Sequence, residues 1–422
     1  MKTKKNSLII VTSLLFILTF VKVYAQSGPN EHGIKFENEQ TAVLVGQDGL
    51  IMRTVDGGLN WTTQTSNVTN VLYGTNSIMD YDEQDPYRIQ LAVGENGVML
   101  KSIDNGLTWI LKDIGITQTL KGIDMITNSL YVAAGDEGII IMSNDKGETW
   151  SSVSSGVTEN LNDIMFVLYP YQVISASRGI VVGNNGTILI SDDNGLTWSQ
   201  VTSNTSETLN TIYFAYENLI FAAGNNGIML KSNDLGNTWT IVETGVSEHI
   251  YDIKLISESV CLATGENGLI LRSENAGSTW TEITSGVTTD LFTVNFGSSS
   301  FAMTAGENGT ELYTTDGGLT WVNREVDNPV SGKTTNDIIL SQNFPNPFNP
   351  ATIISYELPF NANVSVKVYD MLGKEVRTLA NSYQIAGSYS VAFDGSNLSS
   401  GIYFYTVSAG SFVKTMKMIL TK

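Results

Sequence analysis

Residues 223–239 read AGNNGIMLKSNDLGNTW, and residues 264–280 read TGENGLILRSENAGSTW, forty-one residues further along the chain. Near-identity at a fixed spacing indicates an internal repeat, and a repeat decides the fold before any other feature. The shared pattern is G-x-x-G, an apolar run, and then [ST]-x-[DN]-x-G-x-[TN]-W. It occurs seven times and accounts for all seven tryptophans of the chain. The copies end at Trp61, Trp109, Trp150, Trp198, Trp239, Trp280 and Trp321.

Each repeat predicts four short antiparallel strands. The first segment alternates polar and apolar residues, as in LNTIYFA (209–215), and the second is short and apolar, as in IFAAG (220–224). The turn that follows is Asn-Gly in five copies, which suits a type I′ hairpin because both central residues need a positive φ. The third segment, as in GIMLKS (227–232), is apolar on consecutive residues, which is typical of a strand covered on both faces.

The element S-x-D-x-G-x-T-W lies between the third and fourth strands and has the composition of a turn. Its acidic side chain can accept backbone N–H bonds, and its glycine permits a left-handed backbone. Its tryptophan offers a large apolar surface, which we expect to pack against the next repeat. We therefore assign these residues a structural role rather than a catalytic one. The turn residues are Asp56, Asp104, Asp145, Asp193, Asp234, Asp316 and, as the amide variant, Asn275.

These turns resemble Asp-box (BNR) repeats, as in SNDKGETW (143–150) and SDDNGLTW (191–198). The longer unit, with its G-x-x-G hairpin, resembles the β-propeller of the photosystem II assembly and stability factors, over about residues 30–325. The resemblance implies a seven-bladed propeller with each box between strands three and four of a blade. Because the chain opens with a first strand and closes after a fourth, we expect the ring to close without a swapped strand.

The last eighty residues read as a second, smaller domain. Residues 326–340 are polar and patternless and predict a linker, and residues 341–422 predict a small antiparallel β-sandwich. The segments NFPNPFNPATIISYELP (343–359), VKVYDMLGKEV (366–376) and LSSGIYFYTV (398–407) resemble the type A C-terminal sorting domain of the type IX secretion system of Bacteroidota. That resemblance implies that the secretion machinery reads this tail and usually removes it. An accessory binding sandwich is the alternative.

The first twenty-five residues have the pattern of a signal peptide. A basic start precedes an apolar run of about fifteen residues and a VYA ending, which predicts cleavage near Ala25. Export to the periplasm and then to the cell surface or the medium follows from the two ends together. Cys261 is the single cysteine, so no internal disulfide can form, and its apolar neighbours predict a buried thiol.

Formal charge is −19 overall, and the part between the leader and the tail carries −25, because residues 1–25 contribute +4 and residues 341–422 contribute +2. Such a field repels phosphate backbones, so nucleic acid is excluded as a partner class. The chain has two histidines and no phosphate-binding G-x-x-x-x-G-K-[ST] motif, so we expect no cofactor.

Two of the repeats carry seven extra residues between their first and second strands, in the segments 79–88 and 169–179. Insertions on one face of a repeat array often mark a binding face, although tolerated loop drift is the simpler interpretation. The acidic residues Asp80, Asp82, Glu83 and Asp85 are a weak candidate for a Ca²⁺ site, with a solvated acidic loop as the alternative. Glu311 replaces the Ile or Met of the other third strands, which suggests a less buried face in the last blade.

An Asp-box propeller raises the question of glycoside hydrolysis. A sialidase needs three converging arginines, and the six arginines of this chain give no such triad. Asp163 and Asp252 occupy equivalent first-strand positions and are the candidate acid pair of a polysaccharide-active glycosidase. The corresponding residues elsewhere are Gly or Thr, which favours a different interpretation, in which small or polar residues fill a crowded axial channel.

The sequence is therefore interpreted as a secreted or cell-surface, non-enzymatic binding protein that acts as a monomer. Its partner would be an extracellular glycan or protein at the propeller, in addition to the secretion machinery at the tail. A polysaccharide-active glycosidase is the alternative function. The assembly-factor role of the photosynthetic relatives does not fit, because the propeller is acidic and exported. Candidate contacts are the two insertions and the acidic hairpin rim of Glu95, Asp136, Glu266 and Glu307.

Overall fold

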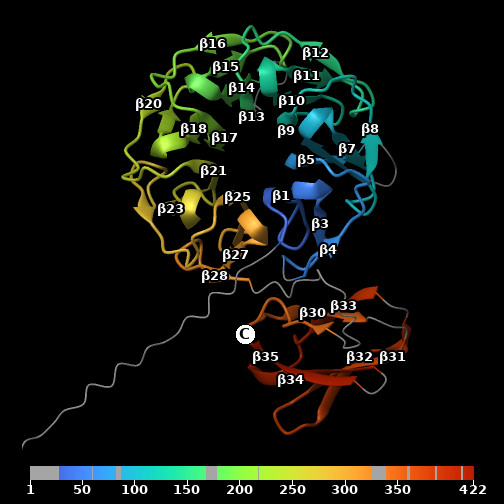
Figure 1. Ribbon diagram of the computed structural model, residues 1–422. Helices are drawn as coiled ribbons and strands as arrows, with labels where there is room; N and C mark the ends of the chain where they lie inside the picture. The colour runs from blue at the N-terminus through green and yellow to red at the C-terminus, as the bar shows by residue number, and fades with distance from the viewer. Residues whose placement is uncertain are drawn as a thin grey trace, which may run out of the picture.

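The computed structural model describes residues 28–58, 60–81, 87–167, 178–216, 218–324, 339–358, 362–384, 387–409 and 412–422. Seven four-stranded antiparallel sheets form a closed ring, and a separate two-sheet domain follows (Figure 1). The predicted seven-bladed propeller and small β-sandwich are therefore confirmed. The predicted signal peptide, residues 1–25, and nearly all of the predicted linker lie outside the described residues. Within the described part of the chain, no helix is long and apolar enough to cross a membrane.

Each blade is a simple meander of four consecutive strands. The strands of blades one to four are β1 (Glu31–Phe36), β2 (Ala42–Gly46), β3 (Ile51–Thr54), β4 (Thr62–Thr63); β5 (Leu72–Asp80), β6 (Tyr87–Gly94), β7 (Met99–Ser102), β8 (Ile110–Lys112); β9 (Leu120–Met125), β10 (Tyr131–Gly135), β11 (Ile140–Ser143), β12 (Ser151–Val153); and β13 (Leu161–Val167), β14 (Arg178–Gly183), β15 (Ile188–Ser191), β16 (Ser199–Val201).

Blades five to seven repeat this order. Their strands are β17 (Leu209–Tyr216), β18 (Leu219–Gly224), β19 (Met229–Ser232), β20 (Thr240–Ile241); β21 (Ile250–Leu255), β22 (Cys261–Gly265), β23 (Ile270–Ser273), β24 (Thr281–Glu282); and β25 (Leu291–Phe296), β26 (Ala302–Gly306), β27 (Glu311–Thr314), β28 (Val322–Asn323). The first strand of every blade lines the axis, and the short fourth strand is outermost (Figure 1).

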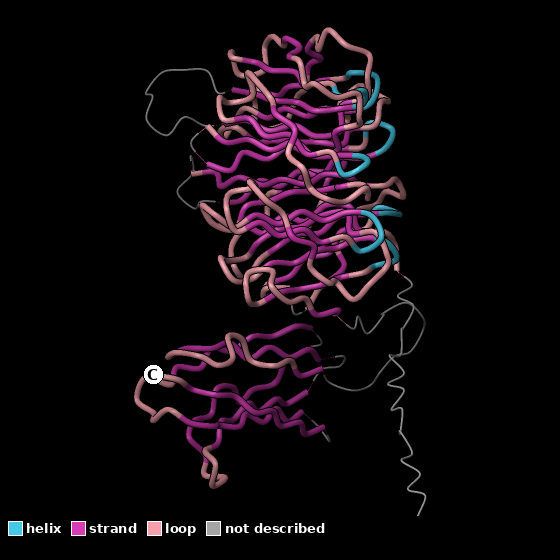
Figure 2. The backbone as a smooth tube through the Cα atoms, turned by 90° about the vertical axis from the view of Figure 1, so that its left-hand side faces the viewer, coloured by secondary structure: helices cyan, strands magenta, loops and turns pink. Residues whose placement is uncertain are grey.

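A tight turn joins the second and third strands of each blade. Asn226 (φ 54°) and Gly227 (φ 68°) both have a positive φ, as the Asn-Gly pattern predicts for a type I′ turn. All of these turns lie on one side of the ring, which we call the hairpin face, and the Asp-box turns lie on the opposite side, the box face (Figure 2). The turns are η1 (Gln47–Gly49), η2 (Glu95–Gly97), η3 (Asp136–Gly138), η4 (Asn184–Gly186), η5 (Asn225–Gly227), η6 (Glu266–Gly268) and η7 (Glu307–Gly309).

The Asp-box carboxylates organise the turn between the third and fourth strands. In blade five, the Asp234 Oδ1 accepts hydrogen bonds from the Ser232 hydroxyl (2.8 Å) and the Thr238 N–H (2.9 Å). Its Oδ2 accepts from the Thr238 hydroxyl (2.7 Å). The Gly236 N–H in turn donates to the Ser232 Oγ (2.8 Å). One carboxylate therefore binds both ends of the turn.

The box of each blade packs against the preceding blade, not the next one as the sequence analysis expected. Trp109 of blade two joins a buried cluster with Val43 and Ile51 of blade one. The box glycine lies closest to this interface: a Cβ built on Gly318 (φ 84°) would lie 2.6 Å from Leu262 of blade six. A direct backbone approach of this kind requires glycine, both for space and for the left-handed conformation.

The ring closes between blades seven and one without a swapped strand. Sheets β1–β4 and β25–β28 each use consecutive strands, as expected. Gly58 of the first box contacts Met303 of blade seven, so the closing interface uses the same box packing as the others. The hairpin contact is also repeated, because the Asn30 Oδ1 accepts the Asn308 N–H (3.0 Å) as the Asn160 Oδ1 accepts the Glu137 N–H (3.0 Å).

The closing interface holds a largely buried group of charged residues, Glu31, Glu311 and Arg324. Glu311 is 1% exposed, so the expectation of a less buried face in blade seven was wrong. Its carboxylate pairs with the Arg324 guanidinium (2.6 Å). Glu31 is buried beside them, where the other first strands begin with Leu or Ile. Burial, and secondarily the negative charge of Glu311, raises the pKa of Glu31 well above its usual range. Cys261, by contrast, is buried as predicted.

The C-terminal domain packs two antiparallel sheets face to face, with strand orders β29-β30-β33 and β32-β31-β34-β35. Val366, Phe393 and Tyr405 lie in its buried core. The Tyr405 hydroxyl donates to the Ser341 carbonyl (2.6 Å) and accepts from the Asn343 N–H (2.8 Å), which fixes the entry segment. The strands are β29 (Ile339–Leu340), β30 (Ala351–Leu358), β31 (Ala362–Tyr369), β32 (Glu375–Gln384), β33 (Gly387–Asp394), β34 (Gly401–Ala409) and β35 (Phe412–Leu420).

Replacing an Asp-box carboxylate tests its structural role. We expect Asp234→Ala to lower the free energy of unfolding by about 1–2 kcal/mol, because it removes acceptors for three hydrogen bonds. Asp234→Asn should cost less, since Asn275 accepts from the Thr279 N–H (2.9 Å) in the natural sequence. Urea unfolding measures both values, and an alanine variant as stable as the parent would contradict the assignment.

The buried pair at the closing interface gives a second stability test. We expect Arg324→Met to lower the free energy of unfolding by about 3 kcal/mol, because it leaves Glu311 buried without its partner. Glu311→Ile combined with Arg324→Met should recover most of this loss, since the equivalent third-strand residues are Ile or Met. Calorimetry of the single and double variants measures the loss in free energy of unfolding of each. Equal losses in both variants would show that the pair does not act as a unit.

Candidate functional site

The seven first strands enclose a cavity of about 270 Å³ on the axis of the ring. These strands are the inner edges of their sheets, so one side of each carries backbone groups that no further strand pairs. Polar side chains from the neighbouring blades form hydrogen bonds with several of these backbone groups. The cavity is therefore polar in its depth, and its chemistry is set by which side chains the first strands turn inward.

A β-bulge occurs at the same place in all seven first strands, close to the hairpin face. In β21, for example, Ile250 pairs with Gly265 and Asp252 with Thr264, which leaves Tyr251 as the extra residue. Bulges re-aim side chains and are common beside functional sites. All seven extra residues line the cavity: His32, Tyr73, Lys121, Asn162, Asn210, Tyr251 and Phe292. We call this ring the mouth.

Four consecutive blades fill half of the mouth with aromatic rings. The ring centroids of Tyr251 and Phe292 are 5.4 Å apart, those of Phe292 and His32 are 4.8 Å apart, and those of His32 and Tyr73 are 5.2 Å apart. All four side chains are only partly buried. We call this unbroken series the aromatic arc. Burial lowers the pKa of His32 to about 4, against the opposing effect of Glu95, so its imidazole is neutral at neutral pH.

The four predicted rim carboxylates lie around the mouth, each at the first position of a hairpin turn. The Glu95 carboxylate accepts from the Val71 N–H (3.1 Å). The Glu266 carboxylate accepts from the His249 N–H (3.2 Å). Asp136 is different, because it forms an ion pair with Lys121 of the mouth (2.8 Å). Glu307 accepts from the Asp290 N–H (3.5 Å).

Asp163 and Asp252 lie deeper on the axis, where each connects its blade to the next. The Asp163 Oδ2 accepts from the Ile212 N–H (3.0 Å) of blade five, and the Asp252 Oδ2 accepts from the Val294 N–H (3.0 Å) of blade seven. Asp124 repeats the arrangement, accepting from the Phe166 N–H (2.7 Å) of blade four. These carboxylates satisfy backbone groups of an edge strand that would otherwise have no partner.

The charges of this inner layer are compensated. The Lys254 Nζ lies 2.6 Å from the Asp252 Oδ1. Burial lowers the pKa of Lys254, but Asp252 and Asp163 raise it by more, so it stays protonated. Burial raises the pKa of Asp163 to about 6, partly offset by Lys254. The Thr211 hydroxyl lies between the two carboxylates, 3.4 Å from the Asp163 Oδ2 and 3.2 Å from the Asp252 Oδ1.

The weak Ca²⁺ candidate is only partly within the described residues. Asp80 is fully buried and paired with the Lys146 Nζ of the neighbouring box (2.7 Å). Asp82, Glu83 and Asp85 lie outside the described residues, as do residues 82–86 of the first insertion and residues 169–177 of the second. Among the residues that are described, no group of three or more His, Cys, Asp or Glu is placed to hold a metal ion.

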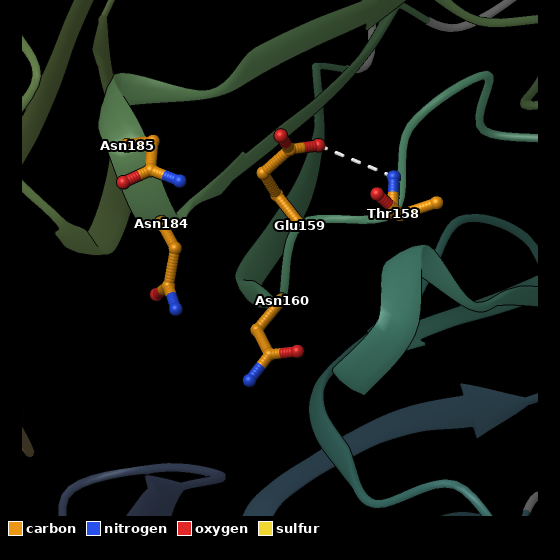
Figure 3. Close-up of a pocket in the computed structure, with 5 residues that line it drawn as sticks. All are labelled: Thr158, Glu159, Asn160, Asn184 and Asn185. Carbon is orange, nitrogen blue, oxygen red and sulfur yellow. Dashed lines mark hydrogen bonds between the residues drawn. The ribbon is translucent and has the colours of Figure 1, made fainter.

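An open polar depression of about 310 Å³ lies on the hairpin face beside the mouth (Figure 3). Thr158, Glu159, Asn160, Asn184 and Asn185 line it. The Thr158 N–H donates to the Glu159 carboxylate (3.2 Å). The depression lies next to the mouth: the Nδ2 of the mouth residue Asn162 donates to the Oδ1 of Asn184, which lines the depression (3.1 Å).

Sequence reasoning identified the rim carboxylates and the two axial aspartates but missed the mouth. The available signal was the position just before Gly33, Gly74, Gly122, Asp163, Thr211, Asp252 and Thr293, which varies in chemical type between otherwise similar repeats. A bulge leaves no mark in the alternation of polar and apolar letters, so nothing in the pattern showed that this residue turns toward the axis.

Comparison with known proteins separates the chain into the same two parts. Residues 342–421 match the secretion system C-terminal sorting domain, and residues 150–283 match the photosynthesis system II assembly factor YCF48. No curated protein matches the chain.

Similar solved structures include YCF48 bound to D1 peptide, with 18% identity, a TM-score of 0.56 and coverage of 68% of this chain and 92% of that one. YCF48 from Cyanidioschyzon merolae has 16% identity, a TM-score of 0.54 and coverage of 68% and 96%. The GH74 enzyme of Niastella koreensis has 14% identity, a TM-score of 0.56 and coverage of 93% and 73%. At these identities the structures show the fold alone. The chain thus joins a seven-bladed propeller that is similar to YCF48 to a domain that matches the secretion system C-terminal sorting domain.

Proposed function

We propose that this protein is an exported, non-enzymatic binding protein whose propeller holds a macromolecular ligand at the mouth of its axial cavity. The observation that carries the proposal is that the side chains at the mouth and those deeper on the axis differ in their contacts. The aromatic side chains of the mouth are partly exposed and available for contact, whereas the carboxylates deeper in the cavity are occupied in connecting blades.

The sorting domain indicates export through type IX secretion to the cell surface or the extracellular space. In our proposal, residues 341–422 contact the secretion machinery and the propeller carries out the function of the exported protein. Neither the lysines of the tail nor its strands contribute to the mouth, so loss of the tail after export would leave the binding site complete.

A polypeptide is a suitable ligand class. One of the similar structures is YCF48 bound to D1 peptide, so a propeller of this fold can hold a peptide. The mouth here offers aromatic surface and carboxylates, and the depression beside it offers the amide groups of Asn160, Asn184 and Asn185 (Figure 3). Amide side chains have both donors and acceptors and can therefore bind a peptide backbone.

A polysaccharide-active glycosidase remains the second candidate, and one observation favours it. Asp163 has a pKa raised to about 6, as a general acid would need, and the Thr211 hydroxyl brings it near Asp252. Against it, both carboxylates accept backbone N–H bonds from a neighbouring blade, so a substrate would have to displace contacts that hold the ring together.

An assay that measures both retention and turnover separates the two functions. We expect the purified chain to retain one or more members of a panel of glycans and peptides without releasing sugars, and Asp163→Asn and Asp252→Asn to leave that retention within about twofold. Asparagine keeps one acceptor oxygen, so both variants should fold. Sugar release that disappears in either variant would establish the glycosidase.

The raised pKa of Asp163 also predicts a pH dependence of stability. The folded pKa of about 6 lies above the unfolded value of about 4, so the folded state holds an extra proton between these values. The free energy of unfolding should therefore fall by about 2 kcal/mol as the pH rises from 4 to 6, relative to Asp163→Asn. Urea unfolding of both proteins between pH 4 and 6 measures the difference. If the free energies of unfolding changed in parallel with pH, the raised pKa of Asp163 would be contradicted.

A further inference from the structure

Negative charge and aromatic surface lie on the same half of the mouth. Of the four blades that supply the aromatic arc, three begin their hairpin turn with a glutamate, namely Glu95, Glu266 and Glu307. The other half of the mouth is neutral or paired: blades four and five have Asn184 and Asn225 at the turn position, and Asp136 of blade three is paired with Lys121.

The carboxylates beside the arc have hydrogen-bond donors, and the basic group recorded beside them is the His249 imidazole, whose Nδ1 lies 3.9 Å from the Glu266 carboxylate. The Glu95 carboxylate lies 3.5 Å from the Tyr73 hydroxyl, and the Asp290 carboxylate accepts from the Tyr251 hydroxyl (3.1 Å). Among the described residues, no lysine or arginine forms an ion pair with Glu95, Glu266, Asp290 or Glu307. Burial, followed by the nearby carboxylates, raises the pKa of both tyrosines.

Grouping like charges at a partly buried site costs free energy that a bound cation would offset. The faces of aromatic rings attract cations, with a contribution of about 0.5–2 kcal/mol that grows as the site loses water. His32 does not oppose a cation, because its imidazole is neutral at neutral pH. A neutral sugar could stack on the arc, but it would leave the carboxylates uncompensated.

We infer that the aromatic arc and the three glutamates beside it form a binding site for the basic side chain, arginine or lysine, of an extended polypeptide. This inference rests on the proposed function and names the chemistry of its ligand. The cavity of about 270 Å³ is slightly smaller than the roughly 300–1,000 Å³ of pockets for whole small molecules, which fits one side chain. The polypeptide backbone would cross the mouth toward the polar depression of Asn160 and Asn184.

The test uses the full chain and two blocked pentapeptides, Gly-Gly-Arg-Gly-Gly and the same peptide with citrulline in place of arginine. Citrulline keeps the shape of arginine but not its charge. By titration calorimetry we expect the arginine peptide to bind at least about tenfold more tightly than the citrulline peptide. Its affinity should weaken as salt rises from about 50 to 300 mM, because ion screening shortens the reach of the charges.

Variants assign the effect to the mouth. Replacing Glu95, Glu266 and Glu307 together by Gln should weaken arginine-peptide binding by at least about tenfold, and Phe292→Ala by about fivefold. Folding is safeguarded, because blade one naturally has Gln47 at the turn position. Asp48→Asn is the matched control: it removes a charge from the same face at an exposed position that is Asn in five other blades, and binding should stay within about twofold.

Each outcome decides between named alternatives. Equal affinity for the two peptides, or unchanged arginine-peptide affinity in the triple glutamine variant, would overturn the inference. Binding of a neutral oligosaccharide that Phe292→Ala abolishes and the glutamine variant retains would overturn it in favour of a glycan, while leaving the proposed binding function intact. Failure of the unaltered chain to retain any peptide or glycan would overturn both.

Discussion

The structure depends on the packing of each Asp-box turn against the blade before it. A blade of this kind is a small sheet with two edges and little core of its own, so it gains stability only by covering a neighbour. The box places a glycine and an indole at that interface, and the carboxylate holds the turn in the one shape that allows the approach. Because blade one packs on blade seven in the same way, the same contact both builds the ring and closes it.

The axis shows how a ring of edge strands avoids unpaired backbone groups. Asp124, Asp163 and Asp252 each accept an N–H from the following first strand, and the Asn295 side chain donates to the Ile34 carbonyl across the closing interface. Acidic residues near the axis of a propeller therefore need not be catalytic. In this chain their geometry is that of inter-blade hydrogen bonding, while the residues free to meet a ligand lie one layer nearer the hairpin face.

Features written within one repeat could be predicted from the sequence, and features that depend on two blades could not. The blade count, the hairpin turns and the Asp boxes follow from spacing inside a single unit. The direction of tryptophan packing depends on the curvature of the ring. The burial of Glu311 depends on Arg324 and Glu31, which lie together in the ring although they are far apart in the sequence. The mouth was missed for a different reason, since a bulge shifts the register without altering the residue pattern.

The residue at the bulge varies between blades, while the fold of the blade stays the same. Seven otherwise alike blades carry His, Tyr, Lys, Asn, Asn, Tyr and Phe at this one place, and every blade folds. The blade fold therefore tolerates side chains of different chemical type at this position. Asn162 and Asn210 also donate to the Leu209 and Ile250 carbonyls of the next blade, so a library for selecting new binders should keep these two residues and vary the aromatic positions of the mouth.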